Sequence, residues 1–568
     1  MCQNSKNIFN KDFAFTFPEN LDKKIEETKK IYHEERCETK LILRKKNLNK
    51  KINHMRKIEF NKNEKQKINV DKLIYLNIPF TAYTSKLSEE FYEENKLIDL
   101  LNKISYILEQ KYRQDNTAKK DLVYQFTKND LIINNFAEKI HNLILKYLKS
   151  DKVMSYLSRI LLFSSLFTEN NLGLNSDNNS YFISSEKYID AYNKILEIYI
   201  NSDCQISYNM IIFIGNILKN SVHNQLSLYS SGTLNYIIDS IDVENDSPNI
   251  LGEKIWCLSQ FKQNKIYEVE AKFSLKIQKV YCEIFFKKEK YSNLFNDINE
   301  KADVNNFLFN YLVLIENTTN CIDSIFIENI IKSTILPYLF TNFIDKDITF
   351  LYIIIDILIN LSQSEYILGH KIINLGSIDF LIKLISNGNF PMDLRISSFI
   401  PINNYINDVQ LWRLVLYEKK VLQLYYSLLN DNELEPNFFS EICLGFYQLL
   451  FYDNKDILKD MLVKNLMKIL CKDIKDIINR VKSEKTVCEC LSQFCALIIA
   501  LIKKKDEEKS LIENLFYVFK QYGGEEIIDS ILCAYSNVDL EERNEEDKET
   551  ISNLLEMAEN INSNIKNE

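Results

Sequence analysis

The sequence predicts an all-α solenoid, that is, a stack of helical repeats, and three observations indicate this fold. Apolar residues recur at spacings of three and four along most of the chain, which is the period of amphipathic helices. The 568 residues include only 10 Gly and 7 Pro, too few turn residues for an all-β protein. A helical sequence motif also recurs along the chain at regular intervals.

The repeated phrase is an apolar helix that ends in an amide residue and is followed by a polar turn and two further helices. Asn216, Gln260, Asn360 and Asn404 occupy equivalent places and are 44, 100 and 44 residues apart, so one unmarked copy fits in the middle. A unit of about 40 to 47 residues is the period of HEAT and armadillo arrays. We therefore expect about ten repeats in one array.

Charge divides the chain into a basic arm and an acidic body. Residues 1–70 contain 18 Lys and Arg against 10 Asp and Glu, a balance of +8, although the whole chain has a formal net charge of -9. The remaining residues therefore carry -17. Composition and pattern predict five segments: a disordered N-terminus over 1–20, a basic helix over 21–60, a linker over 61–71, the solenoid over 72–540 and an acidic tail, either a helix or a frayed end, over 541–568.

The repeat phrases resemble those of importin alpha, the nuclear-import adaptor built from armadillo repeats. Ile212–Asn216 is similar to the family's W-A-L-G-N, and Trp256–Gln260 to its T-W-T-L-S-N-L. Tyr522, Gly523 and Gly524 are similar to the family's closing repeat, E-A-G-G-x-x-x-I. The resemblance covers roughly residues 150 to 560 and implies an armadillo solenoid wound as a right-handed superhelix.

The basic arm resembles the family's importin-beta-binding segment, whose core reads E-L-R-K and which ends in K-R-R-N. Here the core is Glu38–Lys46, and the ending is weakened to His54–Lys57. The resemblance implies that importin beta binds the arm, through the basic residues Arg44, Lys45, Lys46, Lys50, Lys51, Arg56 and Lys57.

In the family, a Trp and an Asn four residues apart on the third helix of each repeat line a groove. Asn amides can hold an extended peptide backbone, and neighbouring Trp rings hold lysine stems. The resemblance implies that cargo with a basic localisation signal binds at Ser165, Asn216, Trp256, Gln260, Asn360 and Asn404. It further implies an adaptor that shuttles between cytoplasm and nucleus and is recycled by an exportin with Ran. Only Trp256 remains among the expected Trp positions, so we expect weaker binding of ordinary basic signals.

Two other functions stay open. An armadillo-type scaffold that no longer binds nuclear signals would explain the missing Trp residues, and a nucleic-acid-associated protein would use the arm on phosphates, against its acidic body. Catalysis and cofactors are not expected, because no GxGxxG or GxxxxGK occurs and no His stands in an HExxH. No metal is expected either, because the 12 Cys form no CxxC pair. The most apolar stretch, Phe350–Leu361, is too short to span a membrane.

Overall fold

The computed structural model describes most of the chain from residue 80 onward. The described ranges are 80–87, 93–115, 136–166, 186–202, 204–220, 222–261, 271–296, 306–319, 324–364, 366–408, 410–431, 434–450, 455–505, 508–536 and 545–566. The predicted disordered N-terminus, basic helix and linker lie outside these residues, as do Arg44, Lys45, Lys46, Lys50, Lys51, Arg56 and Lys57.

Every element in the described ranges is a helix, and the regular repeats contain three helices each. The first helices are α10 (Val222–Ser230), α16 (Ser324–Lys332), α19 (Tyr366–Asn374), the π-helix η5 (Leu414–Glu418), α25 (Lys455–Val463) and α28 (Lys509–Gln521). The second helices are α6 (Phe136–Tyr147), α8 (Glu186–Tyr199), α11 (Thr233–Asp239), α17 (Ile335–Asn342), α20 (Ser377–Ser386), α23 (Val421–Leu429), α26 (Leu466–Arg480) and α29 (Gly524–Tyr535).

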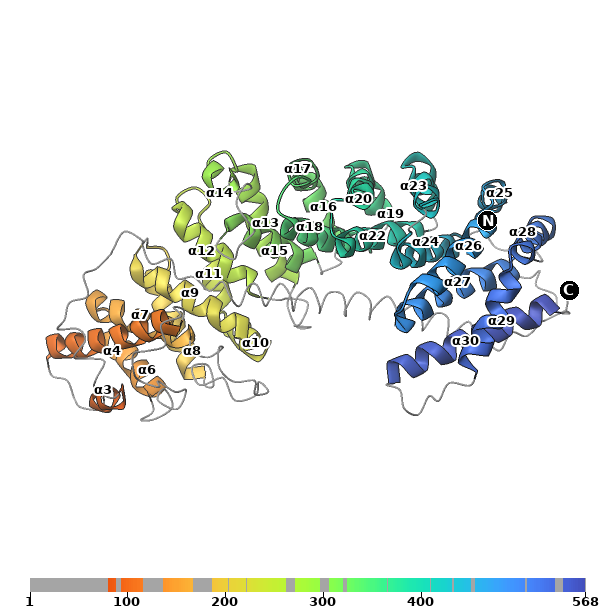
Figure 1. Cartoon of the computed structure of the whole chain (residues 1–568). Coiled ribbons are helices and arrows are strands. Elements are labelled where there is room, and N and C mark those ends of the chain that lie inside the picture. The colour runs from red at the N-terminus through yellow and green to blue at the C-terminus, as the bar shows by residue number, and fades with distance from the viewer. Residues whose placement is uncertain are drawn as a thin grey trace, which may run out of the picture. The chain divides into compact units, whose positions relative to one another are not determined.

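The third helices form one continuous row in which each member packs against the next (Figure 1). They are α4 (Glu94–Asp115), α7 (Asp151–Leu166), α9 (Gln205–Asn220), α12 (Pro248–Ser259), α15 (Phe307–Thr319), α18 (Ile348–Leu361), α22 (Phe399–Ile406), α24 (Pro436–Leu449), α27 (Glu484–Lys503) and α30 (Glu545–Lys566). The remaining helices are α3 (Phe80–Lys86), α13 (Ala271–Phe286), α14 (Ser292–Asn296) and α21 (Met392–Ser397).

A residue in the left-handed conformation joins the first and second helices of each regular repeat. This conformation stops one helix and turns the chain into the next, and glycine adopts it without steric cost. Within the described residues, the backbone has a positive φ at Gly232, Thr334, Gly376, Lys420, Asn465 and Gly523, and all six stand at such junctions. The repeat therefore has a fixed backbone signature even where glycine is absent.

The solenoid continues past residue 540, where we expected it to end. Helix α30 packs against α27 and α29 as the last third helix of the row. Its buried residues are Ile551, Leu554, Met557, Ala558, Ile561 and Ile565, most of which follow a three- and four-residue spacing. Of the helix or frayed end expected for 541–568, the described residues form an amphipathic helix that packs as part of the solenoid, with Glu549 and Glu559 exposed to solvent.

Helix α27 is the one described helix that is long and apolar enough to cross a membrane by length and composition. Its apolar side chains are largely buried, and it packs against α24, α26 and α30. A third helix in a solenoid is apolar on most of its surface because neighbouring helices enclose it on several sides.

Candidate functional site

The third helices from α9 to α24 share one narrow side on which no other described helix is packed. Helix α12, for example, packs against α9 and α15 in the row and against its own second helix, α11. The residues on the remaining side are half-buried rather than buried, and we call them the third-helix strip. Its members are Tyr208, Ile212, Glu253, Trp256, Gln260, Val313, Glu316, Tyr352, Asp356, Asn360, Asn404, Leu444 and Gln448.

Helix α18 shows the strip most clearly. Apart from its first residue, all side chains of this helix are buried except Tyr352, Asp356 and Asn360, which are four residues apart. Residues at i and i+4 lie on one helix face, so these three form a line along α18. The helix thus presents a phenol, a carboxylate and an amide in sequence.

The half-buried Asn side chains also tie neighbouring third helices together. Asn360 Nδ2 donates to Thr319 Oγ1 of α15 at 3.0 Å. Asn404 Nδ2 donates to Ser362 Oγ, directly after α18, at 2.8 Å. Each amide therefore has a structural bond across the repeat boundary as well as a place on the strip.

Ser165 and Asn216 occupy a different position from the one expected. Both are buried, each with only 2% of its surface exposed, and Asn216 Nδ2 donates to Ser165 Oγ at 3.0 Å. In this structure, their polar groups lie beneath the strip rather than on it. Of the six residues expected to contact cargo, the strip therefore contains Trp256, Gln260, Asn360 and Asn404.

Trp256 is held against the preceding repeat by a glycine. A Cβ added to Gly215 would come within 2.3 Å of the Trp256 ring, so the indole lies directly on the backbone of α9. Gln260 follows Trp256 by one turn, and its Nε2 donates to Trp256 O and to Ser259 Oγ. One face of the indole is thereby packed, while the side chain as a whole stays half-buried.

The structure adds two amide positions that the sequence pattern missed. Asn317 of α15 fills the unmarked copy, and its Nδ2 donates to Ser259 O of the preceding repeat at 3.0 Å. Gln448 of α24 lies 44 residues after Asn404 at the equivalent place. Neither follows a Trp four residues earlier, because Val313 and Leu444 stand there, so the family phrase is absent from both helices.

Carboxylates on the strip are concentrated on three consecutive third helices. Glu253 lies on α12, Glu316 on α15 and Asp356 on α18, and all three are half-buried. Helices α9 and α22 contain no acidic residue at all, and the single acidic residue of α24, Glu441, is buried. The centre of the strip is therefore acidic and its two flanks are neutral or apolar.

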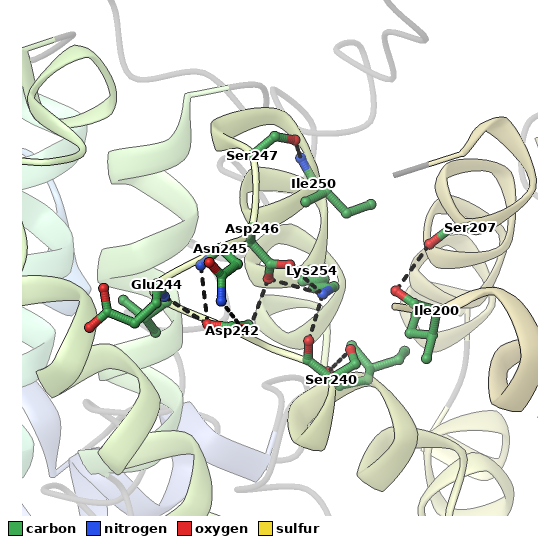
Figure 2. A network of polar contacts seen from close by, with 12 residues as sticks. Ile200, Ser207, Ser240, Asp242, Glu244, Asn245, Asp246, Ser247, Ile250 and Lys254 are labelled. Atoms are coloured by element: carbon green, nitrogen blue, oxygen red, sulfur yellow. Dashed lines mark hydrogen bonds and ion pairs between the residues drawn. The ribbon is translucent and has the colours of Figure 1, made fainter. Parts of the chain in front are cut away.

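A buried lysine anchors the loop that leads into α12 (Figure 2). Lys254 Nζ is fully buried and donates to both carboxylate oxygens of Asp246, at 2.9 and 3.1 Å, and to Ser240 O at 2.8 Å. In the same loop, Asn245 donates to the Asp242 carboxylate, which lowers the pKa of Asp242. Because Lys254 is two residues from Trp256, this network also fixes the helix that carries the indole.

No group of three His, Cys, Asp or Glu side chains within the described residues is placed to hold a metal ion. Two thiols of α27 bond other groups: Cys488 donates to the Tyr535 hydroxyl and Cys490 to Pro436 O, each at 3.2 Å. Burial raises the pKa of the Cys495 thiol to about 12. These cysteines pack as small apolar residues.

Comparisons with known proteins identify the fold but no family. No protein-family model matches the sequence, and no curated protein sequence matches it. An engineered protein, structural genomics target OR497, aligns with a TM-score of 0.51 at 10% identity, over 85% of this chain and 99% of its own. A structure from work on a conserved phosphorylation switch in the interaction between cadherin and beta-catenin aligns with a TM-score of 0.55 at 10% identity, over 86% of both chains.

Computationally designed armadillo repeat proteins for modular peptide recognition also align, with a TM-score of 0.30 at 12% identity, over 52% of this chain and 94% of theirs. The protein has an armadillo-repeat solenoid fold. Identities near a tenth identify the fold and leave the partner open.

Proposed function

We propose that this protein is a nuclear import adaptor that holds a basic, extended segment of its cargo on the third-helix strip and binds importin beta through its N-terminal arm. The observation that carries the proposal is the strip itself, with Trp256 and Gln260 beside three half-buried carboxylates on α12, α15 and α18. Amides can bond any peptide backbone, and carboxylates next to an indole favour lysine and arginine. Such an adaptor shuttles between cytoplasm and nucleus.

The arm supports the second half of the proposal through its charge alone. Residues 40–67 contain 11 basic side chains against Glu59 and Glu64. A basic segment next to an acidic body can bind an acidic carrier, and can also compete with cargo for the strip, because tethering gives it a local concentration on the order of mM. Capture of the arm by importin beta would then free the strip for cargo.

Cargo binding is tested with the full chain and a fluorescent lysine-rich signal peptide, by anisotropy at two salt concentrations. Trp256→Ala removes the one indole of the strip, and we expect binding to weaken by about tenfold, as for an aromatic interface anchor. Tyr517→Ala is the matched control, because Tyr517 is an exposed aromatic residue of α28 outside the strip. Equal affinity in both variants would contradict the proposed site.

The role of the arm is tested by co-purification of importin beta with the intact chain. Replacing Arg44, Lys45 and Lys46 by Glu should abolish co-purification, because the charge of the arm reverses where the family core lies. The control replaces Lys464, Lys468 and Lys472 by Glu, three exposed lysines of the solenoid. Retention of importin beta by the arm variant would exclude this carrier.

The second candidate is a scaffold with the same solenoid but no nuclear cargo. The observation in its favour is that aliphatic residues, Ile212, Val313 and Leu444, stand where the family has aromatic slots. If the arm-substituted chain, with its competing segment weakened, still binds no lysine-rich peptide, the scaffold is the better description.

A further inference from the structure

The strip has two kinds of surface, and their order along the row specifies a partner sequence. Along the row from α9 to α24, its middle positions are Ile212, Trp256, Val313, Asp356 and Leu444, and the corresponding Ile400 of α22 is buried. Glu253 and Glu316 lie within one turn of Trp256 and Val313. The acidic section thus spans α12 to α18, and an aliphatic side chain stands beyond it on each side.

We infer that the partner segment has basic residues at every third position in its centre and apolar residues at its ends, rather than a continuous run of lysines. The inference rests on the proposed function, since it specifies the segment that the strip would hold. Lysine stems gain from an indole face but not from a cation–π interaction with isoleucine or leucine. At α9 and α24, a lysine would also meet no exposed carboxylate on the helix beneath it.

The expected spacing of three residues follows from the distance between neighbouring third helices and from the length of one turn of the bound peptide. Packed helices lie about 8–10 Å apart, so one step along the row covers that distance. A peptide in the polyproline II conformation has three residues per turn and rises about 9.3 Å over them, with i and i+3 on the same side. A bound segment therefore advances three residues per third helix, and α9 to α24 correspond to about 16 residues.

Within such a segment, position 1 meets Ile212, positions 4, 7 and 10 meet the carboxylates of Glu253, Glu316 and Asp356, and position 16 meets Leu444. The probe is a labelled peptide with Leu at the two ends and Lys at the three central positions, made in both chain directions. A second peptide has the same composition with its lysines adjacent. A third keeps the central lysines and replaces the terminal leucines by lysine.

Affinities are measured by anisotropy on the full chain with Arg44, Lys45 and Lys46 replaced by Glu. We expect the spaced, leucine-ended peptide in one direction to bind about tenfold more tightly than the adjacent-lysine peptide, because only the spaced lysines can form all three half-exposed ion pairs. Asp356→Asn should weaken binding of the spaced, leucine-ended peptide severalfold. Leu444→Asp should make the chain bind the leucine-ended and the lysine-ended peptides with equal affinity. The exposed Asp345→Asn serves as the control and should change neither value.

The outcomes separate the two levels of the proposal. Tighter binding of the adjacent-lysine or lysine-ended peptide, or equal binding of all three, would overturn the sequence rule while leaving the strip as a peptide site. Absence of binding by every peptide would overturn the proposed function itself.

Discussion

Neighbouring third helices are joined differently in the centre of the row and at its C-terminal end. Between α7 and α22, side-chain amides donate across four repeat boundaries: Asn216 to Ser165, Asn317 to Ser259, Asn360 to Thr319 and Asn404 to Ser362. At α24, the residue equivalent to Asn404 is Gln448, whose buried Oε1 makes no hydrogen bond among the described residues. The hydrogen bond between α22 and α24 comes instead from Asn403, whose Nδ2 donates to Glu441 Oε2 at 3.0 Å. From α24 to α30, the described contacts between neighbouring third helices are mainly apolar, aromatic and thiol contacts.

The same backbone repeat can therefore be joined to its neighbour by side-chain hydrogen bonds or mainly by packing. A hydrogen bond has a fixed geometry, so amide ties determine how one third helix sits on the next. Apolar contacts are non-directional and tolerate small shifts. The central third helices, which contain most of the strip, are therefore positioned more strictly than the C-terminal ones.

The C-terminal region also contains a buried carboxyl group, one oxygen of which has no hydrogen bond among the described residues. Asp473 of α26 is only 7% exposed, and its Oδ2 makes no hydrogen bond within the described part of the chain. Burial raises the pKa of Asp473 to about 7, against an ordinary value near 3.8. The unfolded chain releases this proton near pH 4, whereas the folded chain keeps it until about pH 7. The free energy of unfolding should therefore fall as pH rises between these values and level off above them.

The largest expected effect is the removal of this pH dependence by Asp473→Asn. The wild-type chain should lose up to about 4 kcal/mol of local stability in α26 and α27 between pH 4 and pH 7, and the variant should keep it. Hydrogen exchange of these helices at pH 5, 6, 7 and 8, corrected for intrinsic exchange, measures the loss. The exposed Asp476→Asn is the control. Identical pH profiles for wild type and Asp473→Asn would show that the carboxyl is solvated.

A smaller effect on stability is expected from removing one of the amide hydrogen bonds between central third helices. Asn404→Ala and Ser362→Ala each remove the same hydrogen bond between α22 and the end of α18. Together they form a double-mutant cycle, for which we expect a coupling of about 1 kcal/mol in urea unfolding followed by exchange of α18 and α22.

The same two variants distinguish a structural role of Asn404 from a role in peptide binding. Ser362→Ala breaks the tie but leaves the Asn404 amide on the strip, so peptide affinity should stay near wild type. Asn404→Ala removes both and should weaken binding severalfold if the amide holds peptide backbone. Equal losses of affinity in the two variants would mean that Asn404 acts only by positioning α22.

The repeat fold could be predicted because its period appears directly in the sequence, as the phrases ending in Asn216, Gln260, Asn360 and Asn404 show. The packing of α30 into the solenoid was not predicted, because the charge was counted over the whole segment, although Ile551, Leu554 and Ala558 already had helical spacing. The burial of Asn216 could not be predicted, because it depends on a hydroxyl 51 residues earlier on a neighbouring helix. Sequence reveals the period, whereas contacts between repeats decide which amides reach the surface.

The smallest effect concerns the helix junctions, where the two regions can be compared directly. The central junction before α17 has Thr334 at φ 59°, and the C-terminal junction before α26 has Asn465 at φ 53°. A β-branched residue is strained in the left-handed conformation, whereas Asn tolerates it. Thr334→Gly should therefore stabilise the chain by about 1 kcal/mol, and Asn465→Gly by less, because the gain is partly offset by the greater freedom of glycine when unfolded. Urea midpoints measure both, with Thr334→Ala as the control that keeps a side chain at positive φ. A larger gain at Asn465 would show that the C-terminal repeats hold their junctions under more strain than the central repeats do.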